Sequence, residues 1–218
     1  MSVLAHDLRS PLTVIRGAAT LLIESREELP AERVHALLGI IESQAGQMAD
    51  KVDDMLAAAR LDGDRLRLFD EDADLGGIVA NALDAARRVA RGRRLRAGGV
   101  IDGISVHADS ERVAQVLRIL LDNAVRYSPD AAWIEVRAEP SSSSVRVEVR
   151  DRGAGIPAGD RERIFERFQR LDSGGNGSGL GLYVARGLAR AMAGECGVDS
   201  RPGGGSVFWF TVPNSKTK

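Results

Sequence analysis

Two long apolar repeats open this 218-residue chain and limit what its first part can form. In both, apolar residues recur at spacings of four and three, the spacing of an amphipathic helix close to a coiled-coil repeat. The first run covers positions 4, 8, 12, 15, 19 and 22, and the second covers 34, 38, 41, 45, 48, 52, 55 and 59. Glu27, Glu28 and Pro30 separate the two runs. The pattern therefore predicts a helical hairpin.

A single hairpin has too narrow an apolar seam to be stable by itself, so we expect two chains to pair as a dimeric four-helix bundle. The alternative is a two-helix appendage that packs against the chain's own second domain. The length and regularity of the second run favour the homodimer.

The pattern changes at Asp62-Gly63-Asp64, which ends the second helix. We predict that residues 1–63 form the hairpin and that residues 64–218 form a second domain. Its expected elements are a strand within 66–73, a helix at 75–89, a strand at 104–106, a helix at 110–127 capped by Asp109, strands at 134–138 and 145–150, a helix at 180–193, and strands near 198 and at 207–212. Helices separated from a mostly antiparallel, partly mixed sheet make an α+β two-layer sandwich.

Composition excludes several classes of protein. The formal net charge of −1 gives no electrostatic reason to expect a nucleic-acid partner. A single cysteine, Cys196, excludes an internal disulfide framework and a cysteine zinc site. No apolar run reaches the ~18 to 20 residues that a membrane-spanning helix needs, and the N-terminus lacks a signal-peptide pattern.

The first helix carries a histidine that is followed directly by a carboxylate, His6-Asp7. If Asp7 holds or accepts the proton on one ring nitrogen, the other nitrogen of His6 becomes a nucleophile. Pro11 removes a backbone donor and weakens the helix at Asp7, four residues earlier. A His-Asp pair on a helix is by itself more often a cap or a surface ion pair, so the downstream motifs decide between the two readings.

Three features of the second domain indicate a nucleotide. The stretch from Asp151 to Pro157 places a carboxylate at a strand end beside glycines, where a base amine can donate and a planar base can lie on the backbone. The stretch from Gly177 to Leu182 opens a helix, and bare amides at a helix N-terminus bind phosphate. Asn123 offers a neutral amide oxygen that suits Mg²⁺, with Arg126 and Tyr127 on the next turn.

In this order the motifs resemble those of the sensor histidine kinases of two-component systems. The matching stretches are His6-Asp7-x-Arg9-x-Pro11, Leu120-Leu121-x-Asn123-Ala124-x-Arg126-Tyr127, Asp151-x-Gly153-x-Gly155, Ile164-Phe165-Glu166-Arg167-Phe168, Gly177-x-Gly179-Leu180-Gly181-Leu182, and a last glycine box from Pro202 to Phe208. The resemblance covers essentially the whole chain. It implies a dimerisation and phosphotransfer hairpin followed by a Bergerat-fold (GHKL) ATP-binding domain.

The resemblance also assigns roles to residues. It implies that His6 is the phosphoacceptor within a box that includes Asp7, Arg9 and Ser10, and that Asn123 is the Mg²⁺ ligand. The nucleotide-binding residues it implies are Asn123, Arg126, Tyr127, Asp151, Gly153, Gly155, Ile156, Phe165, Arg167, Phe168, Arg170, Gly177, Ser178, Gly179, Leu180, Gly181, Leu182 and Ser206. Among these Asp151 is the adenine reader, and the span 159–176 is expected to be the ATP lid.

The same resemblance implies the cofactors ATP and Mg²⁺ and two partners. These are a second copy of the chain and the receiver domain of a response regulator, whose aspartate takes the phosphoryl group. We expect the chain to be the cytoplasmic catalytic part of a longer bacterial sensor, in contact with a membrane only through segments outside it.

Two positions depart from the family pattern. Ile119 stands one turn before Asn123, where relatives often carry asparagine and hydrolytic relatives carry a glutamate that activates water. Ser10 stands where many relatives have threonine or asparagine that aligns water for dephosphorylation of the regulator, so a phosphatase activity is not implied. The rivals are a GHKL-type ATPase or anti-sigma serine kinase, which Ile119 and the His6 box disfavour, and a degenerate kinase that serves as a dimeric scaffold.

Three further residues have plain interpretations. His35 is expected on a solvated face of the hairpin, and His107 is expected to be structural. Cys196 has no cationic neighbour in sequence and is expected to be a small strand residue, not a reactive thiol.

Overall fold

A computed structural model describes residues 2–25, 29–63, 65–90, 92–99, 101–171 and 178–215, without the side chains of residues 2–7 and 89. The chain divides into two compact units. The first reaches Ala59, and the second holds Arg60–Leu171 and the chain from Gly179 onward. The last turn of the second helix therefore belongs, by its contacts, to the second unit.

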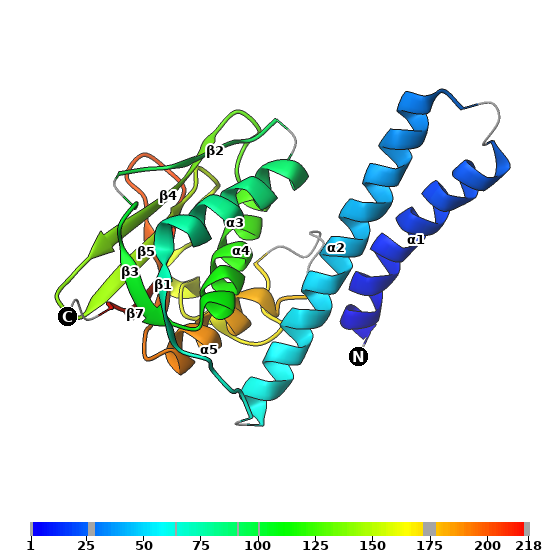
Figure 1. Cartoon of the computed structure of the whole chain (residues 1–218). Helices are drawn as coiled ribbons and strands as arrows, with labels where there is room; N and C mark the ends of the chain where they lie inside the picture. Colours follow the sequence, from blue (N-terminus) through cyan, green and yellow to red (C-terminus); the bar gives the residue numbers. More distant parts are fainter. Residues whose placement is uncertain are drawn as a thin grey trace. The chain divides into compact units, whose positions relative to one another are not determined.

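The first unit is the predicted helical hairpin. Helix α1 spans Ser2–Glu24 and helix α2 spans Ala31–Asp62, and the two run antiparallel side by side (Figure 1). Pro11 lies inside α1, and the helix continues through it. Few described side chains of the hairpin are buried within one copy: Pro11, Ala18, Leu37, Ala57 and Ala58. In the described ranges, no helix has the length and apolar character that crossing a bilayer requires.

The second unit is the predicted α+β sandwich. Its elements are β1 (Glu71–Asp74), α3 (Leu75–Val89), β2 (Arg94–Ala97), β3 (Ser105–Ala108), α4 (Ser110–Tyr127), β4 (Trp133–Pro140), β5 (Ser144–Arg150), the short helices η1 (Ala158–Asp160) and η2 (Arg163–Phe165), α5 (Gly181–Ala191), β6 (Cys196–Ser200) and β7 (Ser206–Pro213). As predicted, Asp109 caps α4, and its Oδ1 accepts a hydrogen bond of 3.1 Å from the Arg112 amide.

Five strands form one sheet in the order β2-β4-β5-β7-β6, and β1 pairs with β3 in a separate antiparallel ribbon. Only the β2–β4 pair of this sheet is parallel, which confirms the partly mixed sheet. The predicted strand within 66–73 lies later, at 71–74. Strand β2 was not predicted, because Leu95 is its one buried residue and the strand is too short to show a period.

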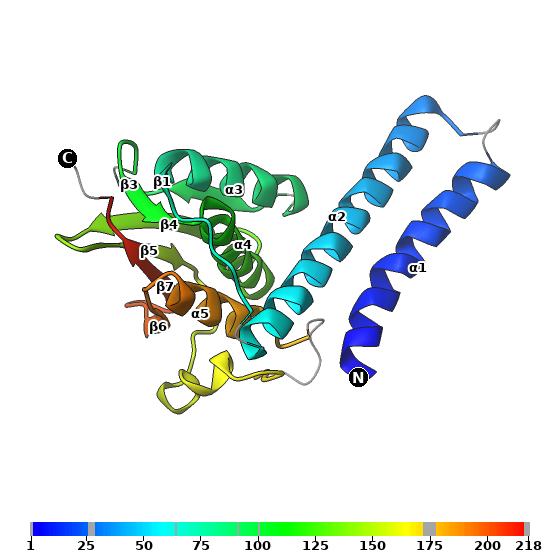
Figure 2. The same cartoon turned by 60° about the horizontal axis from the view of Figure 1, so that its bottom comes forward.

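Helices α3, α4 and α5 cover one face of the five-stranded sheet (Figures 1 and 2). The core between them comes from alternate strand residues and from the apolar stripe of each helix. Its largest fully buried side chains include Phe210, Leu75, Leu117, Leu120, Leu121, Ile134 and Leu188. This packing fixes the rotation of α4, and so the direction in which its polar residues face.

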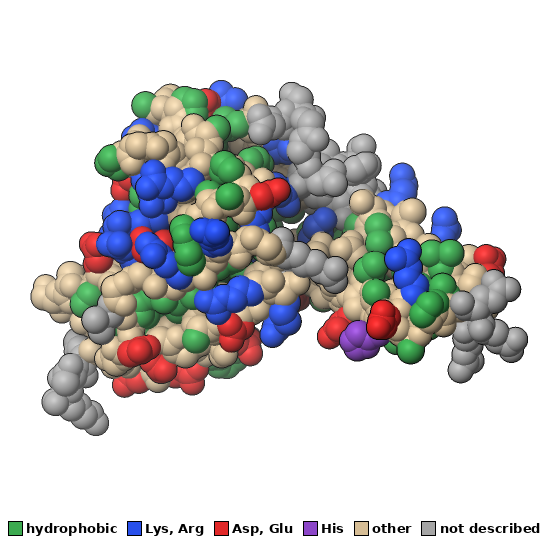
Figure 3. Space-filling model, turned by 90° about the horizontal axis from the view of Figure 1, so that it is seen from above, with side chains coloured by type: hydrophobic (Ala, Val, Ile, Leu, Met, Phe, Trp, Pro, Cys, Tyr) green, Lys and Arg blue, Asp and Glu red, His purple; other side chains and the backbone are tan. Residues whose placement is uncertain are grey.

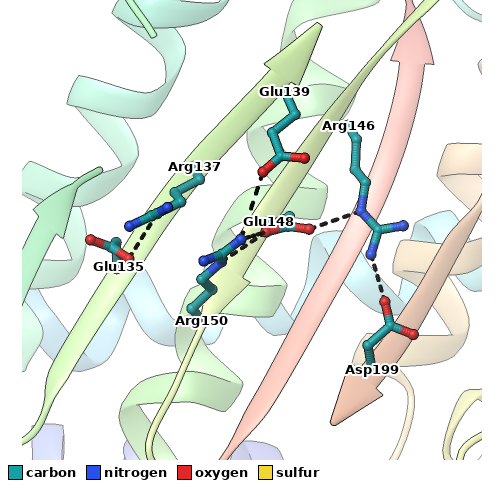
Figure 4. Close-up of polar contacts among 7 residues, drawn as sticks. All are labelled: Glu135, Arg137, Glu139, Arg146, Glu148, Arg150 and Asp199. Atoms are coloured by element: carbon teal, nitrogen blue, oxygen red, sulfur yellow. Dashed lines mark hydrogen bonds and ion pairs between the residues drawn. The ribbon is translucent and has the colours of Figure 1, made fainter. Parts of the chain in front are cut away.

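The opposite face of the sheet carries a lattice of ion pairs (Figure 4). Glu148 accepts hydrogen bonds from the Nε atoms of Arg146, at 2.9 Å, and Arg150, at 2.8 Å. Glu135 is paired with Arg137 and Arg96, both at 2.9 Å. Burial raises the pKa of each glutamate, but the arginines outweigh it and leave both pKa values lowered. Because their charges are paired with arginines, Glu135 and Glu148 can be buried on the face of the sheet that the helices do not cover.

Candidate nucleotide site

Asp151 lies at the end of β5 and is 3 % exposed. The antiparallel register of β5 and β7 brings it beside Ser206, whose carbonyl accepts a 2.9 Å hydrogen bond from the Asp151 amide. The amides of Gly153 and Ser206 donate to Oδ1 of Asp151 at 2.7 and 3.2 Å. The carboxylate is therefore held in one orientation, as an acceptor that reads a base must be.

Burial raises the pKa of Asp151 above its usual value, although the hydrogen bonds from Gly153 and Ser206 and the charge of Arg201 act in the opposite direction. Because burial shields this carboxylate from water, it is a strong acceptor for a hydrogen-bond donor of a bound ligand.

Backbone segments near Asp151 lie so close together that two positions leave no room for a side chain. A Cβ on Gly153 would lie 2.6 Å from the carbonyl oxygen of Tyr127. A Cβ on Gly205 would lie 2.2 Å from the carbonyl oxygen of Asp151, and Gly205 has a φ of +96°. Both glycines are therefore needed for these backbone segments to meet at Asp151.

The end of α4 lies against the loop that follows Asp151. Asn123 is half-buried, whereas Arg126 is exposed and Tyr127 is 49 % exposed. Ser128 is buried and caps the helix, and its hydroxyl accepts a 3.4 Å hydrogen bond from the Arg152 amide. The end of α4 thus lies against the Asp151 loop through its main chain, and the Tyr127 side chain is exposed to solvent.

The second glycine box leads into α5, which begins at Gly181. Gly179 has a φ of +70°, and a Cβ there would lie 2.7 Å from the backbone carbon of Phe168. A Cβ on Gly181 would lie 3.2 Å from Cγ2 of Ile119, which is 3 % exposed. Ile119 therefore packs beneath this loop as an apolar support. Leu180 is buried, Ser178 and Leu182 are half-buried, and Gly177 lies outside the described residues.

A backbone hydrogen bond closes the span from Phe168 to Gly179, which overlaps the later part of the predicted lid. The amide of Phe168 donates to the carbonyl of Gly179 at 3.0 Å, so the two ends of the span between them are joined. Phe168 has a φ of +64° and is 46 % exposed. Phe165 is buried in η2, with the guanidinium of Arg186 3.9 Å from its ring centre. Residues 172–177 of the predicted lid lie outside the described residues.

Arg167 and Arg170 were predicted among the nucleotide-binding residues. Arg167 forms an ion pair with Asp62, and its guanidinium lies 5.0 Å from the ring centre of Phe168. Asp62 also accepts a hydrogen bond from the Tyr183 hydroxyl, which raises the pKa of that phenol. Arg170 is half-buried. In this conformation the guanidinium of Arg167 is therefore paired with Asp62.

The phosphoacceptor box lies in the first unit, on α1. His6 and Asp7 are part of the helix, but their side chains lie outside the described residues. Arg9 and Ser10 are exposed on the same helix. The predicted phosphoacceptor and the predicted nucleotide site thus belong to different units of the chain.

The predicted metal ligand of the site is the side-chain amide of Asn123. The described residues contain no group of three or more histidine, cysteine, aspartate or glutamate side chains that could cage an ion. A single amide oxygen, that of Asn123, fits Mg²⁺ that takes its other ligands from phosphate and water.

Sequence reasoning missed Arg201 and Ser128. The Arg201 guanidinium donates to the Asp151 carbonyl, and the Ser128 hydroxyl accepts from the Arg152 amide. Both partners are backbone atoms, which every residue has, so the sequence gives no signal of such contacts. The run of three glycines from 203 to 205 was a signal for the close approach at Gly205, since all three have a positive φ.

The plain interpretations hold. His35 is exposed on α2, and His107 pairs across the β1–β3 ribbon with Asp72 at 2.9 Å. Cys196 begins β6 and is 2 % exposed, and burial raises the pKa of its thiol to about 12. Cys196 is therefore a strand residue and not a reactive thiol, as predicted.

Family models match both parts of the chain. Residues 1–64 match the His Kinase A (phospho-acceptor) domain. Residues 108–216 match the model described as histidine kinase-, DNA gyrase B-, and HSP90-like ATPase.

Similar proteins extend over the full length of the chain. The adaptive-response sensory kinase SasA of Thermosynechococcus vestitus is 35 % identical over 98 % of this chain, which spans 59 % of that relative. A solved structure of full-length ShkA in complex with AMPPNP is 29 % identical with a TM-score of 0.69, and covers 99 % of this chain and 46 % of its own. The Acinetobacter baumannii histidine kinase AdeS is 26 % identical with a TM-score of 0.64, over 95 % of this chain and 97 % of its own.

Proposed function

Because the chain belongs to the histidine kinase family, with a phosphoacceptor domain followed by an ATP-binding domain, we propose that it binds ATP in its second unit and transfers the γ-phosphoryl group to His6. The observation that carries the proposal is the buried, pre-oriented carboxylate of Asp151 between two glycine boxes, in the same chain as an intact His6 box. Phosphoryl transfer depends mostly on positioning and on charge neutralisation, which such a scaffold provides.

In the second unit, Asp151 accepts from the exocyclic amine of the base, and Tyr127 lies against the base. The amides of Gly179 and Gly181, at the start of α5, face the phosphates. Asn123 holds Mg²⁺, and the bound ion supplies charge neutralisation to the phosphates. Arg126 and Arg170 add positive charge, and Arg167 joins them when it leaves Asp62.

In the first unit, Asp7 orients the imidazole of His6 and takes or holds its proton. The free ring nitrogen attacks the γ-phosphorus in line with the bond to the β,γ-bridging oxygen. That bond breaks, ADP leaves, and a phosphoramidate remains on His6. The phosphoryl group then passes to an aspartate of a response-regulator receiver domain.

The proposal includes a homodimer through the hairpin. Several large apolar side chains of α1 and α2 are exposed in one copy, and Figure 3 shows hydrophobic side chains at the surface of the hairpin. They include Leu12 at 53 %, Leu21 at 50 %, Leu38 at 51 % and Leu56 at 48 % exposed. A second copy would cover such residues in a four-helix bundle.

The position of Ile119 supports a kinase over an ATPase. A general base that activates water contributes about 10²- to 10⁴-fold to a hydrolytic rate. The buried Ile119 side chain, packed beneath Gly181, offers no such base. We therefore expect bound ATP to be hydrolysed slowly and to react mainly by phosphoryl transfer to His6.

The test is transfer of label from γ-labelled ATP. The unchanged chain should acquire acid-labile, base-stable phosphate, and His6→Gln should acquire none while its ATP affinity stays the same. His35→Gln is the matched control, since His35 is an exposed histidine of the same hairpin. Acid-stable label would indicate a serine kinase, rapid release of free phosphate would indicate an ATPase, and ATP binding without either would indicate a scaffold.

A further inference from the structure

The loop between β6 and β7 turns back tightly on Arg201. Its amide donates to the carbonyl of Gly205 at 3.3 Å, and the amide of Gly204 donates to the carbonyl of Arg201 at 3.1 Å. Gly203, Gly204 and Gly205 have φ values of +80°, +95° and +96°. Because side chains rarely adopt this backbone conformation, the three glycines allow Arg201 and Ser206 to stand at the two ends of one short loop.

Arg201 reaches from this loop to the main chain of Asp151. Its Nη1 donates to the Asp151 carbonyl oxygen at 2.7 Å. The backbone of Gly205 packs against the same oxygen, as its close approach shows. The main chain of Asp151 is thus held by Arg201 and Gly205, while its carboxylate is held by Gly153 and Ser206.

Arg201 is half-buried between like and opposite charges. Burial and the charges of Arg152 and Arg150 lower its pKa, Glu135 and Asp151 act in the opposite direction, and the pKa lies below its usual value. The hydrogen bond to the Asp151 carbonyl therefore places a charged donor in direct contact with the main chain of the residue predicted to read the base.

We propose that Arg201 is a positioning residue for base recognition, which holds the main chain of Asp151, and with it the carboxylate, in the geometry that reads the base. The proposal rests on the proposed function, because it assumes that Asp151 binds adenine. Under this proposal, base specificity also depends on Arg201, which lies fifty residues after Asp151 in the chain.

Arg201 also acts on the carboxylate through its charge. Burial raises the pKa of Asp151, and the positive charge of Arg201 lowers it. The groups that contact Asp151 are Arg201 and Ser206 from the β6–β7 side and Gly153 from its own loop, and Arg201 is the one charged group among them. Loss of Arg201 should therefore make base recognition fail at a higher pH.

The test is ADP binding by calorimetry, on the full chain, from about pH 8 down to about pH 5. Arg201→Gln should weaken ADP binding by roughly three- to tenfold at the upper pH, less than the loss of a direct charge-assisted contact with the ligand, because Arg201 acts only through the main chain of Asp151. The pH at which half of the affinity is lost should also move upward. Arg201→Lys keeps the charge and a donor, so it should recover the pH profile of the unchanged chain.

Arg152→Gln is the matched control. Arg152 is the exposed neighbour of Asp151, and its guanidinium donates to the Gly203 carbonyl at 3.3 Å and not to Asp151. It removes the same charge from the same surface and should leave both affinity and pH profile unchanged. Binding of inorganic tripolyphosphate, which has no base, should be equal in all four proteins.

The outcomes separate the two proposals. An Arg201→Gln profile that coincides with that of the unchanged chain, or equal losses in Arg201→Gln and Arg152→Gln, would overturn the role of Arg201. An unchanged chain that binds no ADP would overturn the proposed function itself. If Arg201→Gln fails to fold, a shifted pH profile in Arg201→Lys would overturn the role, because that variant retains the charge.

Discussion

Replacement of Glu148 by glutamine tests how the open face of the sheet is stabilised. The side chain of Glu148 is 7 % exposed, and those of Arg146 and Arg150 are 31 % and 25 % exposed. Each hydrogen bond between charged groups contributes about 1.5 to 3 kcal/mol when it is shielded from water. Here solvent screens the arginines, and glutamine keeps one acceptor oxygen. We therefore expect Glu148→Gln to lower the free energy of unfolding by about 1 to 2 kcal/mol.

The effect should depend on pH in a defined direction. Burial raises the pKa of Glu148, but Arg150 and Arg146 outweigh it, so the folded-state pKa lies below the ordinary value of 4.5. A carboxylate of this kind stabilises the fold fully above its unfolded pKa, and the contribution is lost as the pH falls through the folded pKa. The difference between the unchanged chain and Glu148→Gln should therefore be complete at neutral pH and shrink below pH 4.5.

Urea unfolding followed by tryptophan fluorescence measures this difference. The chain has two tryptophans, and both lie in this sheet, in β4 and β7, so the signal reports on the second unit. Glu139→Gln is the control, because Glu139 is 61 % exposed and its nearest arginine atom is 3.7 Å away. Equal stabilities of the two variants, or a difference that does not shrink in acid, would refute the account of this lattice.

Three further changes test the site. Asp151→Asn should weaken ADP binding by roughly ten- to a hundredfold, because the backbone amides fix the acceptor oxygen and the new amide group then faces the base amine; unchanged affinity in calorimetry would mean that the base is read elsewhere. Gly205→Ala should abolish measurable ADP binding, since its Cβ would lie 2.2 Å from the Asp151 carbonyl oxygen and its φ is +96°, whereas Gly46→Ala, at a helical glycine of α2 where a Cβ meets nothing within 4 Å, should retain it. Asp62→Asn should lower the pKa of the Tyr183 phenol toward its usual 10.0, because the hydrogen bond to Asp62 is the main cause that raises it; an absorbance titration that does not move contradicts this.

Local periodicity in the sequence determined most of the architecture. The repeats of four and three predicted the hairpin, and the end of α2 at Asp62 follows from the glycine after it. Strict alternation predicted β4 and β5, and the carboxylate before α4 predicted its cap. Each of these features depends on residues that are close together in the sequence, so the sequence alone is enough to predict it.

The motif residues likewise predicted a candidate site, and the structure shows which of them lie together. Asp151 and the glycine boxes were chosen by their chemistry, and the structure brings Asp151, Gly153 and Ser206 into direct contact. What the sequence could not contain was the register between β5 and β7, which sets Arg150 opposite Val207 and thereby places Asp151 next to Ser206. Register is decided by the whole buried face of a sheet, not by the residues at its end.

Only the tertiary structure revealed the supports of the site. Arg201 reaches a backbone carbonyl, Ile119 lies beneath a glycine of the second box, and Arg167 is engaged by Asp62. Strand β2 also escaped prediction, because one buried residue makes no period. These contacts join residues far apart in the chain, and many of them end on backbone atoms that every residue possesses. Residue identity therefore carries no trace of them, and packing of the complete core decides them.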